Sequence, residues 1–200
     1  MSNTEHYYSK NPKSILRVKE IDVAYNGSYY PFKTPSGVFS FSKPDKASLQ
    51  LIKNSVICTN EKILDLGCGY GLIGIIIKKE NPEIELYMSD INKRAIKYTK
   101  ENSKKNNINP EIKEGNLFEP WNGYLFDNIL CNPPFAAGKN IWTKIVREAP
   151  NYLSKKGKIH FVAYHNKGGE RLSGIMKEVF GNIVTLSKNG GIRVYVSFNE

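Results

Sequence analysis

Two kinds of apolar pattern alternate along most of the chain. Short, nearly continuous apolar runs predict buried strands, and apolar residues that recur every three or four positions predict amphipathic helices. Strands are expected over residues 62–66, 84–89, 112–114, 126–131 and 158–164, and helices over 47–54, 72–79, 92–105, about 141–153 and 172–179. This alternation predicts an α/β fold: a Rossmann-like, mostly parallel sheet with helices on both faces.

The two ends of the chain carry antiparallel patterns. Near the start, Asn26-Gly27 separates two runs rich in β-branched and aromatic residues, which is typical of a tight hairpin. Near the end, residues 183–187 and 193–198 flank a glycine turn and predict a closing antiparallel pair. A length of 200 residues fits one domain. We therefore expect a single domain over 1–200, with an N-terminal hairpin extension (1–35) and a core (36–200).

Charge is the most informative part of the composition. Twenty-nine Lys and Arg residues against nineteen Asp and Glu give a net charge of +10. Such a surplus attracts polyanions, although solvated surface lysines alone would produce the same number. No apolar run is long enough to span a bilayer, and residues 1–10 lack the apolar stretch of a leader peptide. We expect a cytoplasmic protein that does not enter a membrane.

The cysteines and histidines do not suggest a metal site. Three residues of each type are scattered along the chain without the close spacing that zinc ligands show. The cysteines are expected to be reduced thiols.

A glycine-rich loop follows the strand expected over residues 62–66. It reads Asp65-Leu66-Gly67-Cys68-Gly69-Tyr70-Gly71 and lies between a strand and a helix, where ligand loops of α/β proteins are found. Asp90 ends the next strand, where an acid can accept hydrogen bonds from ribose hydroxyls. Residues 69–74 also fit the dinucleotide pattern G-x-G-x-x-G. Asp65 favours a ligand that carries an ammonium group over one that carries pyrophosphate.

A second loop, Asn132-Pro133-Pro134-Phe135, follows the strand expected over residues 126–131. The prolines stiffen the backbone and remove two donors, so the side-chain carbonyl of Asn132 and the main-chain carbonyl of Pro133 remain as acceptors. Two fixed acceptors can hold both hydrogens of a ring-conjugated NH2 group, and Phe135 can stack on the ring.

The order of these motifs resembles the class I S-adenosylmethionine-dependent methyltransferases. The segments 36–40, with Asp45 beyond it, and 190–194 resemble the small-domain ribosomal RNA guanine-N2 methyltransferases within that class. The resemblance runs from about residue 32 to 198. It implies a seven-stranded sheet whose last strand is antiparallel, with S-adenosyl-L-methionine above the first two strands. It also implies a set of cofactor-binding residues: Asp65, Gly67, Cys68, Gly69, Gly71, Asp90, Ile91, Asn116, Leu117 and Phe39.

Together these features predict an N-methyltransferase that acts on an exocyclic amino group of a nucleobase. The resemblance selects guanine N2 of ribosomal RNA, as free RNA or in a ribosomal subunit. Asn132, Pro133, Pro134 and Phe135 would hold the substrate. Another RNA base or a protein glutamine amide offers a similar NH2 group. A nicotinamide-dependent oxidoreductase and a non-catalytic RNA-binding module are the alternatives from other classes.

Overall fold

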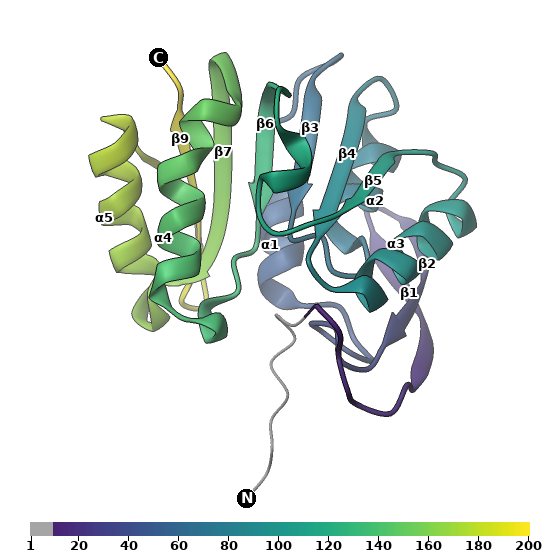
Figure 1. Ribbon diagram of the computed structural model, residues 1–200. Helices are drawn as coiled ribbons and strands as arrows, with labels where there is room; N and C mark the ends of the chain where they lie inside the picture. Colours follow the sequence, from purple (N-terminus) through teal and green to yellow (C-terminus); the bar gives the residue numbers. More distant parts are fainter. Residues whose placement is uncertain (1–9) are drawn as a thin grey trace, which may run out of the picture.

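The computed structural model describes residues 10–200 and consists of a central sheet between two layers of helices (Figure 1). The sheet has seven strands in the order β5-β4-β3-β6-β7-β9-β8. Their bounds are β3 Lys62–Leu66, β4 Glu85–Asp90, β5 Glu111–Glu114, β6 Phe126–Cys131, β7 Leu153–Tyr164, β8 Val184–Asn189 and β9 Ile192–Phe198. The expectation of no leader peptide concerns residues that lie almost wholly outside this range.

The strand directions confirm the mostly parallel sheet. β5, β4, β3, β6 and β7 pair in parallel, and β9, the last strand, runs antiparallel between β7 and β8. The carboxyl ends of the parallel strands therefore meet at one edge. In open α/β sheets this edge is where ligands bind.

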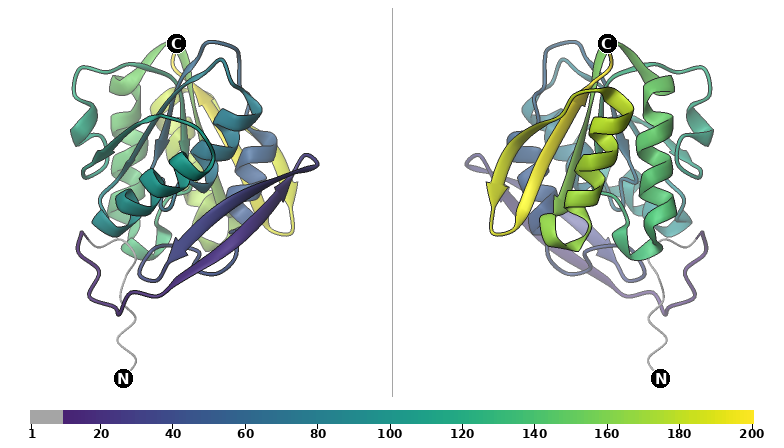
Figure 2. Two further views of the ribbon diagram at one scale, coloured as in Figure 1. Left: turned by 90° about the vertical axis from the view of Figure 1, so that its right-hand side faces the viewer. Right: turned by 90° about the vertical axis from the view of Figure 1, so that its left-hand side faces the viewer.

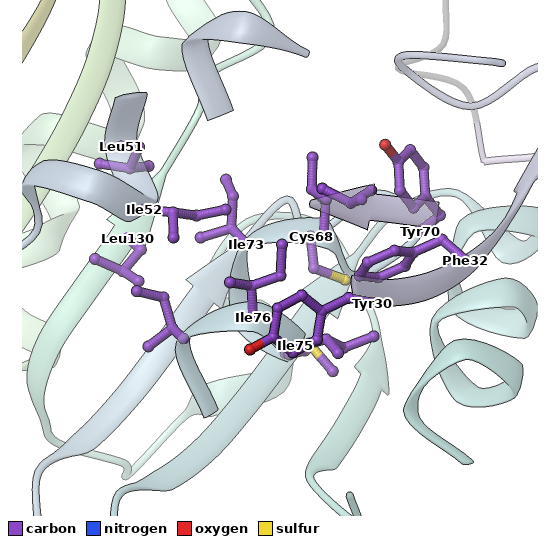
Figure 3. Packing of buried hydrophobic residues seen from close by; sticks show 14 of the residues in the cluster. Tyr30, Phe32, Leu51, Ile52, Cys68, Tyr70, Ile73, Ile75, Ile76 and Leu130 are labelled. Atoms are coloured by element: carbon purple, nitrogen blue, oxygen red, sulfur yellow. The ribbon is translucent and has the colours of Figure 1, made fainter. Parts of the chain in front are cut away.

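Alternation of side chains along the strands divides the core in two. Ile63 and Leu130 face a cluster with α1 (Lys46–Asn54) and α2 (Leu72–Glu80), as Figure 3 shows for Leu130. Their neighbours Leu64 and Ile129 face a cluster with α4 (Lys139–Glu148) and α5 (Gly169–Phe180). Strands buried on both faces explain why these runs are almost continuously apolar.

The helices agree with the apolar periodicity except at the end of α4. The sequence predicted a helix to about residue 153, but α4 ends at Glu148 and a 3₁₀ turn, Ala149–Tyr152, follows. Pro150 has no amide hydrogen, so it cannot donate the next hydrogen bond of the α-helical ladder, and its ring clashes with the preceding turn of an α-helix. Leu153 then begins β7, five residues earlier than the start expected at residue 158.

The N-terminal hairpin is confirmed and is fastened to α3 (Lys93–Lys105). Its strands are β1 (Val18–Tyr25) and β2 (Ser28–Pro35), joined at Asn26-Gly27, both with positive φ. The Asn102 side chain accepts a hydrogen bond from the Lys33 amide at 2.8 Å and donates to the Lys33 carbonyl at 3.0 Å. Figure 2 shows the purple hairpin alongside α3. The hairpin is thus part of the core packing.

Among residues 10–200, no helix combines the length and the apolar character needed to cross a membrane. Within the same range, no three His, Cys, Asp or Glu side chains gather in a group that could hold a metal ion.

Candidate active site

An open pocket lies at the carboxyl ends of β3, β4 and β6, with about 900 Å³ of empty space including its mouth. The pocket joins the glycine loop to the Asn132 loop. Ten residues singled out from the sequence line it: Phe39, Gly67, Cys68, Gly69, Asp90, Ile91, Leu117, Asn132, Pro133 and Pro134.

The glycine loop has a backbone that side chains would strain. Gly67 has φ of 75° and Gly69 has φ of 59°, both in the left-handed region that favours glycine. A β-carbon added at Gly67 would meet no atom within 4 Å. The amides of Gly67 and Cys68 both donate to the carbonyl of Ser89 at the end of β4, at 2.9 and 3.0 Å. The loop is therefore tied to β4 while its backbone stays accessible from the pocket.

Asp65 lies outside the pocket lining and is fully buried. Its Oδ2 accepts a hydrogen bond from the Gly74 amide at 2.9 Å, which caps the first turn of α2. Its Oδ1 has no hydrogen-bond partner among residues 10–200. Burial raises the pKa of Asp65 to about 7, against the lowering effect of the Gly74 hydrogen bond and with a smaller raising effect from Asp90. The sequence suggested direct contact between Asp65 and a ligand ammonium group. Because Asp65 is buried, the ammonium group would have to pass the glycine loop to make this contact.

Asp90 ends β4 and does line the pocket. One carboxylate oxygen accepts from the Gly69 amide at 2.9 Å and the other from the Asn92 amide at 2.8 Å. Burial raises the pKa of Asp90 to about 6, although these backbone hydrogen bonds lower it. Each oxygen keeps a lone pair, so the carboxylate can still accept hydrogen bonds from a diol.

The Asn132 side chain is held from the side of α1. Its Nδ2 donates to Asp45 Oδ2 at 3.0 Å and to Ser48 Oγ at 2.9 Å. The Pro133 carbonyl accepts from the Phe135 amide at 2.9 Å, which leaves it one lone pair. The loop therefore offers two acceptors, as its sequence suggested.

Three other expected residues also lie outside the pocket lining. Gly71 is the N-cap of α2, and Asn116 lines a neighbouring hollow with Lys10 and Glu119. Phe135 is half-buried, with its ring centroid 5.7 Å from that of Trp142. Its stacking on a substrate ring stays a prediction.

The sequence did not reveal how the segment over the pocket is held. The Arg94 guanidinium donates to the Ser36 carbonyl at 2.7 Å, the Ser14 carbonyl at 2.9 Å, the Ser14 hydroxyl at 3.0 Å and the Pro12 carbonyl at 3.3 Å. These bonds fasten residues 12–14 and the turn that precedes Val38 and Phe39. No local sequence signal could have found them, because the partners lie 58 to 82 positions away.

The structure explains part of the match between residues 69–74 and the dinucleotide pattern G-x-G-x-x-G. A β-carbon at Gly74 would lie 2.7 Å from Met88 Sδ and 3.1 Å from Asp65 Oδ2. Gly74 therefore lets α2 pack closely on the sheet, and it does not line the pocket. Gly74, the third glycine of the G-x-G-x-x-G match, is thus explained by its close packing against Asp65.

Comparison with known proteins identifies the family. The profile of the methyltransferase small domain matches residues 29–196. The uncharacterized protein YbxB of Bacillus subtilis (strain 168) is 30% identical over 94% of this chain and 95% of its own length. The ribosomal RNA small subunit methyltransferase C of Hamiltonella defensa is 33% identical over 82% of this chain, but the match covers 48% of that enzyme. The chain spans about half the length of the relatives that carry this name.

Solved structures show the same fold. The T. thermophilus 16S rRNA N2 G1207 methyltransferase, in complex with AdoMet and guanosine, superposes with a TM-score of 0.80 at 22% identity, over 94% of this chain and 52% of that one. A methyltransferase from Pyrococcus furiosus superposes with a TM-score of 0.69 at 16% identity, over 82% and 90% of the two chains. The profile match covers most of the sequence, so this chain belongs to the methyltransferase small domain family.

Proposed function

We propose that this chain is an S-adenosylmethionine-dependent methyltransferase that acts on an exocyclic amino group, and that its substrate is guanine N2 of ribosomal RNA. One observation carries the proposal: a single pocket joins the glycine loop and Asp90 to the acceptors of Asn132 and Pro133. The names of the ribosomal RNA methyltransferase relatives support the choice of substrate. The family membership argues against the oxidoreductase alternative.

The residues of the pocket fit this cofactor. Asp90 would accept hydrogen bonds from the ribose, and the apolar side chains of Val38, Ile91 and Leu117 suit the faces of an adenine. The backbone at Gly67 leaves free space for the methionine part. When bound, the cofactor supplies a methyl group activated by a positively charged sulfur.

The residues of the Asn132 loop would act by holding the substrate amine. Asn132 Oδ1 and the Pro133 carbonyl each accept one of its hydrogens, which orients the nitrogen lone pair toward the methyl carbon. The nitrogen held in this way would be placed to take up the methyl group that the bound cofactor supplies. The amine then releases one proton to water. No protein nucleophile is required, so the chain contributes mainly by positioning.

The charge of the surface suits a polyanionic substrate. Four lysines at positions i, i+4, i+7 and i+11 form one exposed line along α3, here called the α3 lysine stripe: Lys93, Lys97, Lys100 and Lys104. None of them forms an ion pair with a carboxylate among residues 10–200. The stripe starts next to Asn92, which lines the pocket. We propose that it binds phosphates of the RNA that carries the target base.

Calorimetry and a labelled methyl-transfer assay test the proposed function together. The protein should bind S-adenosylmethionine and not NAD, and should transfer labelled methyl groups to ribosomal RNA. Asn132→Ala should bind the cofactor within a few-fold of the unchanged protein but lose methyl transfer by orders of magnitude. Cofactor binding without transfer to RNA or to protein would overturn the assignment. Label in another base or in glutamine would instead correct the substrate.

A further inference from the structure

The two hydrogens of the Asn132 amide are both already used. Nδ2 donates one to Asp45 Oδ2 and the other to Ser48 Oγ. A carboxylate can only accept hydrogen bonds, so the nitrogen of the amide, and not its oxygen, has to face Asp45. The amide oxygen makes no hydrogen bond with residues 10–200, and Asn132 lines the pocket.

The partners of Asn132 are themselves fixed. Asp45 is the N-cap of α1, and its Oδ2 also accepts from the Ser48 amide at 2.7 Å and the Ser48 hydroxyl at 3.1 Å. Ser48 is 5% exposed and belongs to the first turn of α1, whose residues Leu51 and Ile52 are buried in the core. The start of α1 thus presents one rigid pair of acceptors to the Asn132 amide.

We infer that Asp45 and Ser48 are positioning residues that fix the polarity of Asn132. They hold the amide so that it offers only an acceptor to the substrate. Together with the Pro133 carbonyl, this makes the site complementary to an atom that carries two hydrogens, an NH2 group, and a poor match for a bare ring nitrogen. Without them, the amide can rotate by half a turn and present its own NH2 group, which repels the substrate amine. The inference rests on the proposed function and adds two residues to its machinery.

A pair of substitutions at residue 45 separates this role from helix capping. Asp45→Asn keeps an oxygen that can cap α1 and reach Asn132. Asp45→Ser keeps the cap, because serine caps helices as well as aspartate does, but its hydroxyl is too short to hold the amide. We expect both variants to unfold at the same urea concentration as the unchanged protein and to bind S-adenosylmethionine within twofold. Asp45→Asn should keep kcat within about threefold, whereas Asp45→Ser should lose about tenfold or more. Ser48→Ala should also lower kcat with cofactor affinity kept.

The orientation of the amide can also be read without any turnover. In nitrogen–proton correlation spectra of the full chain, the Asn132 side-chain NH2 signals, identified by their absence in Asn132→Ala, should exchange slowly with water. Asp45→Ser should make this exchange fast, and Asp45→Asn should not. Two results would overturn the inference and leave the proposed function standing. The first is fast exchange in the unchanged protein. The second is full kcat in Asp45→Ser, provided that the unchanged protein transfers methyl groups. No methyl transfer by the unchanged protein, with slow exchange retained, would count against the proposed function alone.

Discussion

The buried carboxylate of Asp65 should make the stability of the cofactor-free protein depend on pH. Burial raises the pKa of Asp65 from 3.8 to about 7. Between these values the folded protein holds a proton that the unfolded chain releases, so the free energy of unfolding falls as the pH rises through this window. Each pKa unit corresponds to about 1.36 kcal/mol, and the whole shift costs about 4 kcal/mol of stability once the pH exceeds 7.

Asp65→Asn removes this titration while leaving an oxygen that can accept from the Gly74 amide. Urea unfolding of both proteins from pH 4.5 to pH 8 gives the difference in unfolding free energy, in which the other titrating groups largely cancel. We expect the variant to gain about 3 to 4 kcal/mol relative to the unchanged protein as the pH rises across this range. Asp22→Asn, at an exposed position of β1, is the control and should show no such change. A difference between Asp65→Asn and the unchanged protein that stays constant with pH would refute the reasoning.

Three further predictions test the packing, the pocket cover and the RNA surface. Phe32→Ala should lower the unfolding free energy by about 3 to 5 kcal/mol, because the Phe32 ring is fully buried against Tyr70 of the glycine loop. The control is Tyr29→Ala on the same hairpin, where the side chain is 74% exposed. This control should change the unfolding free energy by less than about 0.5 kcal/mol. Arg94→Met should weaken cofactor binding about tenfold in calorimetry, because the substitution frees the segment that carries Val38. Unchanged affinity would show that this segment does not cover the ligand. Replacing the α3 lysine stripe by glutamines should reduce the slope of log affinity for single-stranded RNA against log salt by up to about 3. The control variant replaces four lysines remote from α3, namely Lys53, Lys62, Lys79 and Lys155. An equal reduction of the slope in this control would exclude a specific role for the stripe.

The fold could be predicted because its signals are local. Burial on both faces makes the runs at 62–66 and 126–131 mostly apolar, and burial on one face gives α3 its periodicity. The end of α4 was placed too late because apolar residues continue through the 3₁₀ turn to Leu153, and the apolar pattern alone does not separate these elements. Pro150 was the signal that would have corrected it.

The candidate site could be predicted only to the level of loops. Because the loops follow neighbouring parallel strands, the sequence indicated correctly that Gly67, Asp90 and Asn132 would meet at one edge. The direction of each side chain depends on partners far along the chain, so the burial of Asp65 against Gly74 and the contact of Asn132 with Asp45, 87 positions earlier, were not visible. Such contacts have no periodicity and are set by the packing of α1 and α2 on the sheet.

The central claim is that the pocket brings an activated methyl group to an NH2 group held by Asn132 and Pro133. Its most direct test is mass spectrometry of nucleosides from unmodified small-subunit ribosomal RNA, free and assembled, after incubation with the protein and deuterium-labelled S-adenosylmethionine. We expect labelled N2-methylguanosine with the unchanged protein and none with Asn132→Ala. A labelled methyl group on an oxygen or a ring carbon, or undiminished N2-methylguanosine with Asn132→Ala, would contradict the claim.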